Sequence, residues 1–198
     1  NSMITINEIT IVRDGREIIY DYSEQIPAGS ITAIVGPNGS GKSTLLAAIA
    51  GDIAPVKGTI TIDDLHPILT SPAQLAQIRA VAIQNQSYTL GFSVQQIIEM
   101  AGPPQDVMRA LELTSLAGRQ VTTLSGGEAQ RVSIATAIAQ STPVLLLDEP
   151  LAAQDIGSRK RIIQLLQKLA EGGVTVVVVA HSDEADLTWA DKVIKQLL

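Results

Sequence analysis

Residues 36–43 read Gly-Pro-Asn-Gly-Ser-Gly-Lys-Ser and fit the pattern G-x-x-x-x-G-K-[ST]. An apolar run at 30–35 precedes this stretch, and a helical segment at 42–50, ended by Gly51, follows it. Such a loop binds phosphate, because its glycines let backbone N–H groups curl round the oxygens and the helix N-terminus favours negative charge. We predict an α/β fold that binds a nucleotide through Gly36, Pro37, Asn38, Gly39, Ser40, Gly41, Lys42, Ser43 and Thr44.

Two residues of this loop have side chains suited to a triphosphate. Lys42 is expected to reach the β- and γ-phosphates, and the Ser43 hydroxyl is expected to bind Mg²⁺. The alternative is a glycine-rich surface turn with an ordinary lysine. The position of the loop between a strand and a helix argues against that alternative.

The rest of the chain alternates between strand and helix patterns. Alternating isoleucines on both sides of Asp14-Gly15 predict two antiparallel strands joined by a turn. Further strands are expected at 58–63, 80–83, 144–147 and 174–180, and helices at 72–79, 158–170 and 183–189. Strands that alternate with helices imply a parallel sheet with right-handed crossovers.

The middle of the chain has a different character. Segments 95–101, 104–113 and 128–139 are all helical in pattern, which predicts a helical insertion. We therefore expect one domain over 3–198, with a parallel-sheet core of the P-loop NTPase type. The same domain is expected to contain an N-terminal antiparallel β subdomain and a helical subdomain at about 87–140. Asn1 and Ser2 precede Met3 and are excluded as a cloning remnant.

Composition limits the functional classes. The 198 residues are 45% hydrophobic and carry a net charge of −6, so the surface as a whole does not attract nucleic acid or an anionic membrane. The absence of cysteine excludes disulfides, thiolate metal sites and cysteine nucleophiles. The apolar run at 174–180 is far shorter than the about 20 residues that span a bilayer, so we expect no direct membrane insertion.

An acidic pair follows a buried strand. Residues 144–147 are apolar and lead into Asp148-Glu149-Pro150, at the edge where open α/β sheets bind ligands. We expect Asp148 to hold Mg²⁺ and Glu149 to polarise the attacking water, a role typically worth about 10²–10⁴ in rate. The alternative is a solvated turn that ends a strand. The phosphate loop earlier in the chain favours the catalytic interpretation.

A second phosphate-binding signal lies at 125–128, which read Ser-Gly-Gly-Glu. Ser125 and Glu128 have the spacing of a capping box, which many plain helices have. A capping box does not need two glycines, each of which costs a helix interior about 1 kcal/mol relative to alanine. Glycines suit close approach of a phosphate. We predict that a nucleotide held by a second copy of the chain contacts Ser125, Gly126, Gly127 and Glu128.

Together these motifs resemble the ATP-binding-cassette (ABC) family over roughly residues 4–195. The loop resembles its Walker A motif, 144–149 its Walker B motif with the catalytic glutamate, and 124–128 its signature sequence. The resemblance implies an ATPase that uses ATP and Mg²⁺ and forms an ATP-dependent head-to-tail dimer. It also implies separate transmembrane permease subunits and a cytoplasmic position on the inner face of the membrane.

The resemblance extends to single positions. Gln84 matches the Q-loop glutamine, which contacts Mg²⁺ and the transmembrane partner, and Gln86 is a second candidate. His181 matches the switch histidine that contacts the γ-phosphate, although a lone histidine at the end of a strand is more often a structural cap. Asp155 matches the D-loop aspartate at the family's dimer interface. Residues 79–84 and 92–94 resemble the iron-chelate and cobalamin import subgroup.

The chain departs from the family pattern at two positions. Arg13 occupies the place of an aromatic residue that stacks on adenine, and a guanidinium plane can also stack on a base. Tyr20 and Tyr22 are expected to pack in their strand instead. Ala152 stands where a serine is common, so a hydroxyl contact across the dimer interface is missing.

Two other functions also use a phosphate loop. An ABC-type ATPase acting on nucleic acid or ribosomes would suit a long coiled-coil insertion or a basic tract. Only 41 positions separate Gln84 from Ser125, and no basic tract is present, so no nucleic-acid partner is expected. An unrelated P-loop kinase or GTPase leaves residues 125–128 and His181 unexplained.

Overall fold

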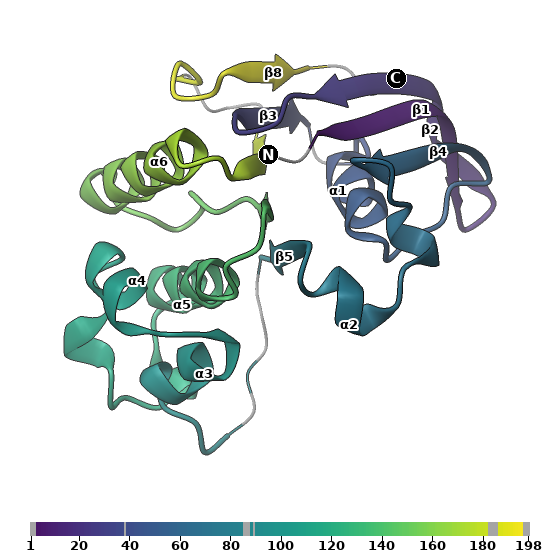
Figure 1. Cartoon of the computed structure of the whole chain (residues 1–198). Coiled ribbons are helices and arrows are strands. Elements are labelled where there is room, and N and C mark those ends of the chain that lie inside the picture. The colour runs from purple at the N-terminus through teal and green to yellow at the C-terminus, as the bar shows by residue number, and fades with distance from the viewer. Residues whose placement is uncertain (1–2, 38, 85–87, 89, 182–185, 196–198) are drawn as a thin grey trace.

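A five-stranded parallel sheet forms the centre of the protein (Figure 1). The computed structural model describes residues 3–37, 39–84, 88, 90–181 and 186–195. The strands lie in the order β5-β6-β7-β3-β8, and every pairing is parallel. They are β3 (Ile31–Gly36), β5 (Arg79–Ala82), β6 (Val144–Asp148), β7 (Thr175–His181) and β8 (Lys192–Ile194). The predicted α/β class with a parallel core is confirmed.

A second sheet is antiparallel and has the order β2-β1-β4. It consists of β1 (Ile4–Arg13), β2 (Arg16–Ile26) and β4 (Lys57–Ile62). Asp14 and Gly15 join the first two strands with φ of 53° and 73°. Two consecutive positive φ angles match the twist of a tight hairpin, for which Asp-Gly is a favoured pair. The predicted antiparallel N-terminal subdomain is confirmed.

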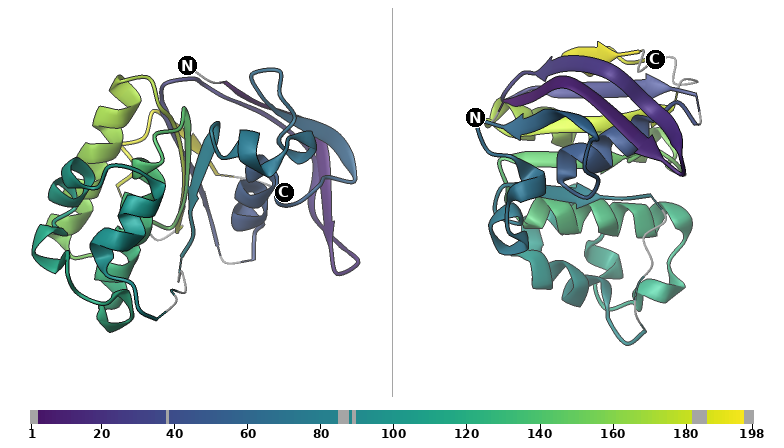
Figure 2. Two further views of the ribbon diagram at one scale, coloured as in Figure 1. Left: turned by 60° about the horizontal axis from the view of Figure 1, so that its bottom comes forward. Right: turned by 90° about the vertical axis from the view of Figure 1, so that its right-hand side faces the viewer.

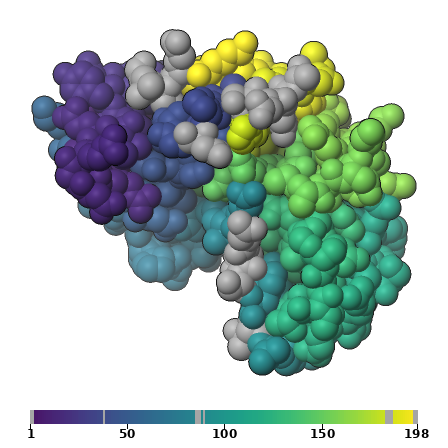
Figure 3. Space-filling model, turned by 180° about the vertical axis from the view of Figure 1, so that it is seen from behind, coloured from purple at the N-terminus to yellow at the C-terminus, as the bar shows by residue number. Residues whose placement is uncertain are grey.

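Helices cover both faces of the parallel sheet, which explains why its strands lack polar alternation. On one face α1 (Lys42–Ala50) and the antiparallel sheet enclose a core that contains Leu45, Val144 and Val177. On the other face α5 (Gly126–Ala139) and α6 (Ile156–Glu171) enclose a core with Leu145 and Val178. Each buried aliphatic side chain contributes roughly 1.5–3 kcal/mol. Seen from behind, the antiparallel sheet and the helical insertion lie at opposite ends of the molecule (Figure 3).

The helical insertion lies between β5 and β6 in the chain. Figure 2 shows it as a teal and green group away from the antiparallel sheet. It contains α3 (Val94–Ala101), α4 (Gln105–Ala110), the 3₁₀ turns η2 (Thr114–Leu116) and η3 (Val121–Thr123), and α5. Ser93 and Gln96 form a capping box that starts α3. The apolar sides of these helices pack against the same core as α6.

Three local predictions differ from the structure. The helix expected at 72–79 is the single turn α2 (Pro72–Leu75), preceded by the 3₁₀ turn η1 (Pro67–Leu69), because the chain enters β5 by Arg79. The helix expected at 183–189 is wrong for residues 186–189, which form a turn, and 182–185 lie outside the described residues. In that turn Asp186 accepts hydrogen bonds from Thr188, and Trp189 Nε1 donates to the Asp186 carbonyl. Strand β8 was not predicted.

The described helices include none with the length and apolar character needed to cross a bilayer.

Candidate functional site

The predicted site residues of the core gather at one edge of the parallel sheet. The phosphate loop follows β3, Asp148 ends β6, His181 ends β7, and Gln84 lies two positions beyond the end of β5. Parallel strands present their carboxyl ends at the same edge, so sequence-distant residues meet there. In register, Gly36 lies opposite His181. Asn38 and Gln86 lie outside the described residues.

Lys42 is the buried cation of this edge, with 5% of the residue exposed. Its Nζ donates to the carbonyl of Gly36 at 2.8 Å and to that of Ala180 at 3.4 Å. It also lies 3.5 Å from Glu149 Oε1. A buried ammonium needs such partners, because its desolvation is otherwise costly. Lys42 thus joins the phosphate loop to the ends of β6 and β7.

Gly36 and Gly41 lie in close contact with neighbouring atoms, whereas Gly39, with φ of +82°, has open space. A Cβ on Gly36 would stand 2.6 Å from Ser40 Oγ, and one on Gly41, with φ of +92°, would stand 2.9 Å from Ile18 Cγ2. Gly41 precedes α1 and supplies no side-chain cap to its N-terminus. The Ser40 hydroxyl is buried with no hydrogen-bond partner among the described residues. Uncapped N–H groups beside a free hydroxyl fit the oxygens of a phosphate.

Ser43 and Asp148 bring two oxygen ligands together. The Ser43 hydroxyl donates to Asp148 Oδ1 at 3.3 Å. Burial raises the pKa of Asp148, and the negative charge of Glu149 adds to this, whereas the Ser43 hydrogen bond and Lys42 oppose it. Mg²⁺ prefers such hard oxygens, and it commonly takes one or two protein ligands together with phosphate oxygens. The pair therefore fits a magnesium ion.

Glu149 has a constrained backbone. Its φ is +49°, which is uncommon for a residue other than glycine. Its N–H donates to the Val179 carbonyl at 2.9 Å, and its own carbonyl accepts from Gln130 Nε2 at 3.3 Å. These bonds hold the strained conformation in place. No sequence pattern pointed to Gln130, a buried residue of α5 that ties this helix to Glu149.

Three further predicted site residues, Gln84, His181 and Arg13, lie outside the cluster formed by Lys42, Ser43, Asp148 and Glu149. Gln84 is an exposed turn residue, and His181 is half-buried at the end of β7. Arg13 is exposed at the end of β1, paired with Arg16 across the hairpin. The same hairpin touches the phosphate loop, because Ile18 packs against Gly41.

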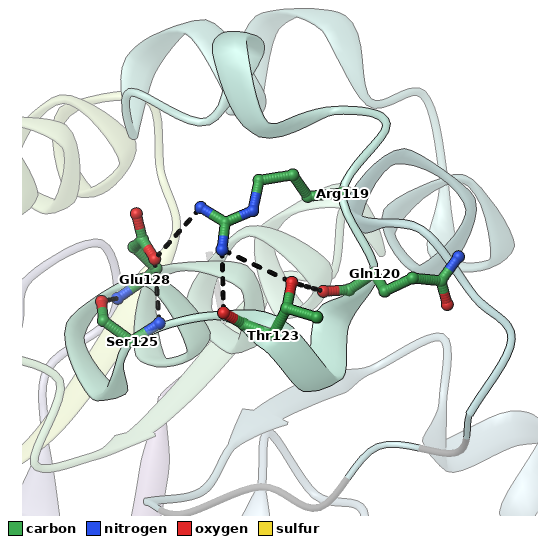
Figure 4. A network of polar contacts seen from close by, with 5 residues as sticks. All are labelled: Arg119, Gln120, Thr123, Ser125 and Glu128. Carbon is green, nitrogen blue, oxygen red and sulfur yellow. Dashed lines mark hydrogen bonds and ion pairs between the residues drawn. The ribbon is translucent and has the colours of Figure 1, made fainter.

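The signature sequence starts α5 with a complete capping box (Figure 4). The Glu128 N–H donates to Ser125 Oγ at 3.2 Å, and the Ser125 N–H donates to Glu128 Oε1 at 2.9 Å. The backbone hydrogen bond from Ser125 is the main reason that the pKa of Glu128 lies below its ordinary value. Arg119 Nη1 lies 3.9 Å from the same carboxylate oxygen. Ser125 and Gly126 are exposed.

The two signature glycines have different surroundings. A Cβ on Gly126 would meet nothing within 4 Å, whereas one on Gly127 would stand 2.7 Å from the Ala153 carbonyl oxygen. Gln154 strengthens this contact, because its Nε2 donates to the Gly127 carbonyl at 3.0 Å and its Oε1 accepts from Arg131 at 2.9 Å. Internal packing thus accounts for Gly127, while the open space at Gly126 faces solvent.

Asp155, expected at a dimer interface, has a role within its own chain. Its Oδ1 accepts from the Ser158 N–H at 2.7 Å and caps α6. An N-cap of this kind typically stabilises a helix by about 1 kcal/mol.

Known proteins resemble this chain over most of its length. The ABC transporter family model matches residues 19–152. The hemin import ATP-binding protein of Nocardia farcinica is 39% identical over 193 residues, which cover 90% of this chain and 67% of that protein. The cobalamin import ATP-binding protein of Halobacterium salinarum is 40% identical over 85% of this chain and 46% of that protein.

Solved structures show the same fold. A bacterial ABC transporter cassette, solved as a dimer, has a TM-score of 0.85 at 27% identity and covers 98% of this chain and 94% of that chain. The family match spans the phosphate loop and the acidic pair, so the resemblance seen in the motifs is confirmed. The alternative of an ATPase acting on nucleic acid is not favoured. This chain belongs to the ABC transporter family, as one of its ATP-binding and ATP-hydrolysing domains.

Proposed function

We propose that two copies of this chain bind MgATP between them and use its hydrolysis to drive import through separate permease subunits. The observation that carries the proposal is the cluster of Lys42, Ser43, Asp148 and Glu149 at one edge of the parallel sheet. A buried cation, a hydroxyl and two carboxylates are the parts that phosphoryl transfer to water needs.

Each residue has a role that its position supports. Lys42 binds the β- and γ-phosphates, and Ser43 and Asp148 hold Mg²⁺, with Gln84 reaching it from the end of β5. Mg²⁺, when bound, neutralises charge on the phosphates. Glu149 accepts a proton from the water whose oxygen attacks the γ-phosphorus, and the bond from that phosphorus to the β,γ-bridging oxygen breaks, so that ADP leaves. His181, opposite Gly36 in the sheet, contacts the γ-phosphate.

The contact between Lys42 and Glu149 suggests how the base is released. Lys42 Nζ has three donors, and here they point to two carbonyls and Glu149. A phosphate is a stronger acceptor for an ammonium than a carbonyl is. When Lys42 turns to the nucleotide, Glu149 becomes free to orient water.

The placement of α1 and α5 on opposite faces of the sheet favours a nucleotide site formed by two copies of the chain. Helix α1, which follows the phosphate loop, packs on the face that carries the antiparallel sheet. Helix α5, which begins at the signature sequence, packs on the opposite face. Ser125 and Gly126 are exposed rather than turned toward their own core. A second copy arranged head to tail would bring its nucleotide to them, and Arg13 would stack on the base of the nucleotide bound to its own loop.

The relatives indicate the cargo. The names of two of them specify import of hemin and of cobalamin, both large metal macrocycles. We infer that the permease served by this chain imports a metal chelate of this size, with the chain on the inner face of the membrane.

Uptake by cells tests this proposal. Cells that lack the gene are complemented with the unaltered chain or with Glu149→Gln, and accumulation of hemin, cobalamin and a ferric chelate is measured. We expect uptake of one of these to need the unaltered chain and to fail with the variant. If uptake of all three is independent of the gene, the cargo proposal is wrong. Purified chain that hydrolyses ATP would still support the ATPase role.

A further inference from the structure

A negatively charged side chain lies where the nucleotide held by a second copy is expected to bind. Glu128 occupies the first turn of α5, three residues after Ser125, where a triphosphate is expected to approach. The carboxylate of Glu128 is ionised at neutral pH, as glutamate ordinarily is. A carboxylate close to a phosphate repels it, and this repulsion is stronger at a protein surface than in bulk water, because the effective dielectric constant is lower there. A cation must offset this charge if the site is to accept phosphate.

Arg119 is placed to offset that charge. Its Nη1 is 3.9 Å from Glu128 Oε1, and its Nη2 donates to the Thr123 carbonyl at 2.8 Å (Figure 4). Thr123 Oγ1 lies 3.4 Å from the same Nη2 and donates to the Gln120 carbonyl. The loop before the signature sequence thus fixes the guanidinium beside Glu128. The Arg119 backbone is fixed as well, because its carbonyl accepts from the N–H of Val94 at the start of α3.

Arg119 holds the loop through its bond to Thr123, but neither that loop nor the capping box needs its ion pair with Glu128. The side chains of Arg119 and Glu128 are 45% and 25% exposed, and an ion pair this exposed adds little to fold stability, because water screens it. The capping box is complete without the arginine, since both of its hydrogen bonds join Ser125 and Glu128. Arg131, the other cation that acts on Glu128, is occupied by Gln154 and the Leu111 carbonyl.

We propose that Arg119 is a positioning residue for the nucleotide held by the second copy. It offsets the negative charge of Glu128, so that Ser125 and Gly126 can receive the γ-phosphate. The inference rests on the proposed head-to-tail dimer.

A charge-rescue experiment tests the proposal. In a Glu149→Gln background, which retains MgATP, the MgATP-dependent dimer is measured by analytical ultracentrifugation for the parent, Arg119→Met, Glu128→Gln and the double variant. Methionine keeps much of the apolar length of arginine without its charge, and glutamine still completes a capping box. We expect Arg119→Met to raise the concentration for half-maximal dimerisation about tenfold and Glu128→Gln to lower it. The double variant should return to within about threefold of the parent.

Three further measurements separate the outcomes. Binding of a fluorescent ATP analogue to monomers at low protein concentration should be the same for the parent and Arg119→Met, because that variant leaves the phosphate loop intact. High salt should reduce the effect of Arg119→Met, since the repulsion is electrostatic. Thermal unfolding without nucleotide should show all four proteins folded.

Each contrary result has a distinct meaning. If the Glu149→Gln parent itself stays monomeric, the proposed dimer fails and the inference fails with it. If the parent pairs and Arg119→Met pairs equally well, the inference alone is overturned. A third contrary result is that Arg119→Met dimerises weakly and is not rescued by Glu128→Gln in the double variant. In that case Arg119 acts by direct contact or by folding the loop, and charge balance is not its role.

Discussion

Gly127 lies so close to Ala153 that a Cβ on the glycine would stand 2.7 Å from the alanine carbonyl oxygen. This contact joins the first turn of α5 to the segment that follows Glu149. Gln130 adds a second link, because its side chain donates to the Glu149 carbonyl. Helix α5 would face the nucleotide of another copy. Within its own chain it packs against the backbone at and after Glu149, the base that would act on the nucleotide bound to that chain.

The two signature glycines should respond differently to alanine. Gly127→Ala forces a Cβ against backbone, and overpacking typically costs about 1–3 kcal/mol. Gly126→Ala has open space and gains up to about 1 kcal/mol of helix propensity. Urea unfolding of both variants measures the difference in the free energy of unfolding. Equal stability of the two would show that close packing is not what requires glycine at 127.

The Gln154 side chain should stabilise the same contact. Gln154→Met keeps the length of the side chain but removes its hydrogen bonds with the Gly127 carbonyl and with Arg131 Nη1. We expect a loss of about 1–2 kcal/mol in the free energy of unfolding. Gln164→Met, at an exposed position of α6, is the matched control and should change little. A loss of similar size in both variants would point to an effect of methionine itself.

Sequence patterns predicted most of the fold because they are local. The phosphate loop, the Asp14-Gly15 hairpin and the apolar strands each carry their signal within about ten residues. Strand β8 is only three residues long and has no such signal. The turn at 186–189 depends on Asp186 accepting bonds from Thr188 in place of helical hydrogen bonds.

The contacts around the site were harder to predict. Lys42, Ser43, Asp148 and Glu149 could be named because their motifs are short and their strands end at one edge. Gln130 and Gln154 could not, because they bond to backbone carbonyls 19 and 27 positions away. Such contacts follow from how α5 packs on the segment after β6. No local pattern encodes that packing.

Asp148 should make stability depend on pH. Its pKa is raised in the folded protein, so between the ordinary value of 3.8 and the raised value the folded state binds more protons than the unfolded state. Stability then falls as pH rises through this window, and the ionised carboxylate is unfavourable at neutral pH. Asp148→Asn removes the effect. We expect the variant to be more stable than the parent at neutral pH without nucleotide.

Urea unfolding of both proteins over a series of pH values tests this. The difference between them should grow as pH rises above about 4 and then level off, because titration of the other groups cancels in the comparison. A constant difference across the series would mean that Asp148 titrates alike in the folded and unfolded chains.

Replacement of Glu149 should separate nucleotide binding from hydrolysis. Glu149→Gln removes the base but keeps the shape of the side chain, so we expect turnover to fall by about two or more orders of magnitude. MgATP binding should persist, because the variant loses the ion pair with Glu149 that competes with the phosphates for Lys42. Lys42→Met is the contrasting variant and should lose nucleotide affinity. Single-turnover hydrolysis and equilibrium binding measure the two effects. Near-normal turnover in Glu149→Gln would remove Glu149 as the base and leave the activation of water to another group at the same edge of the sheet.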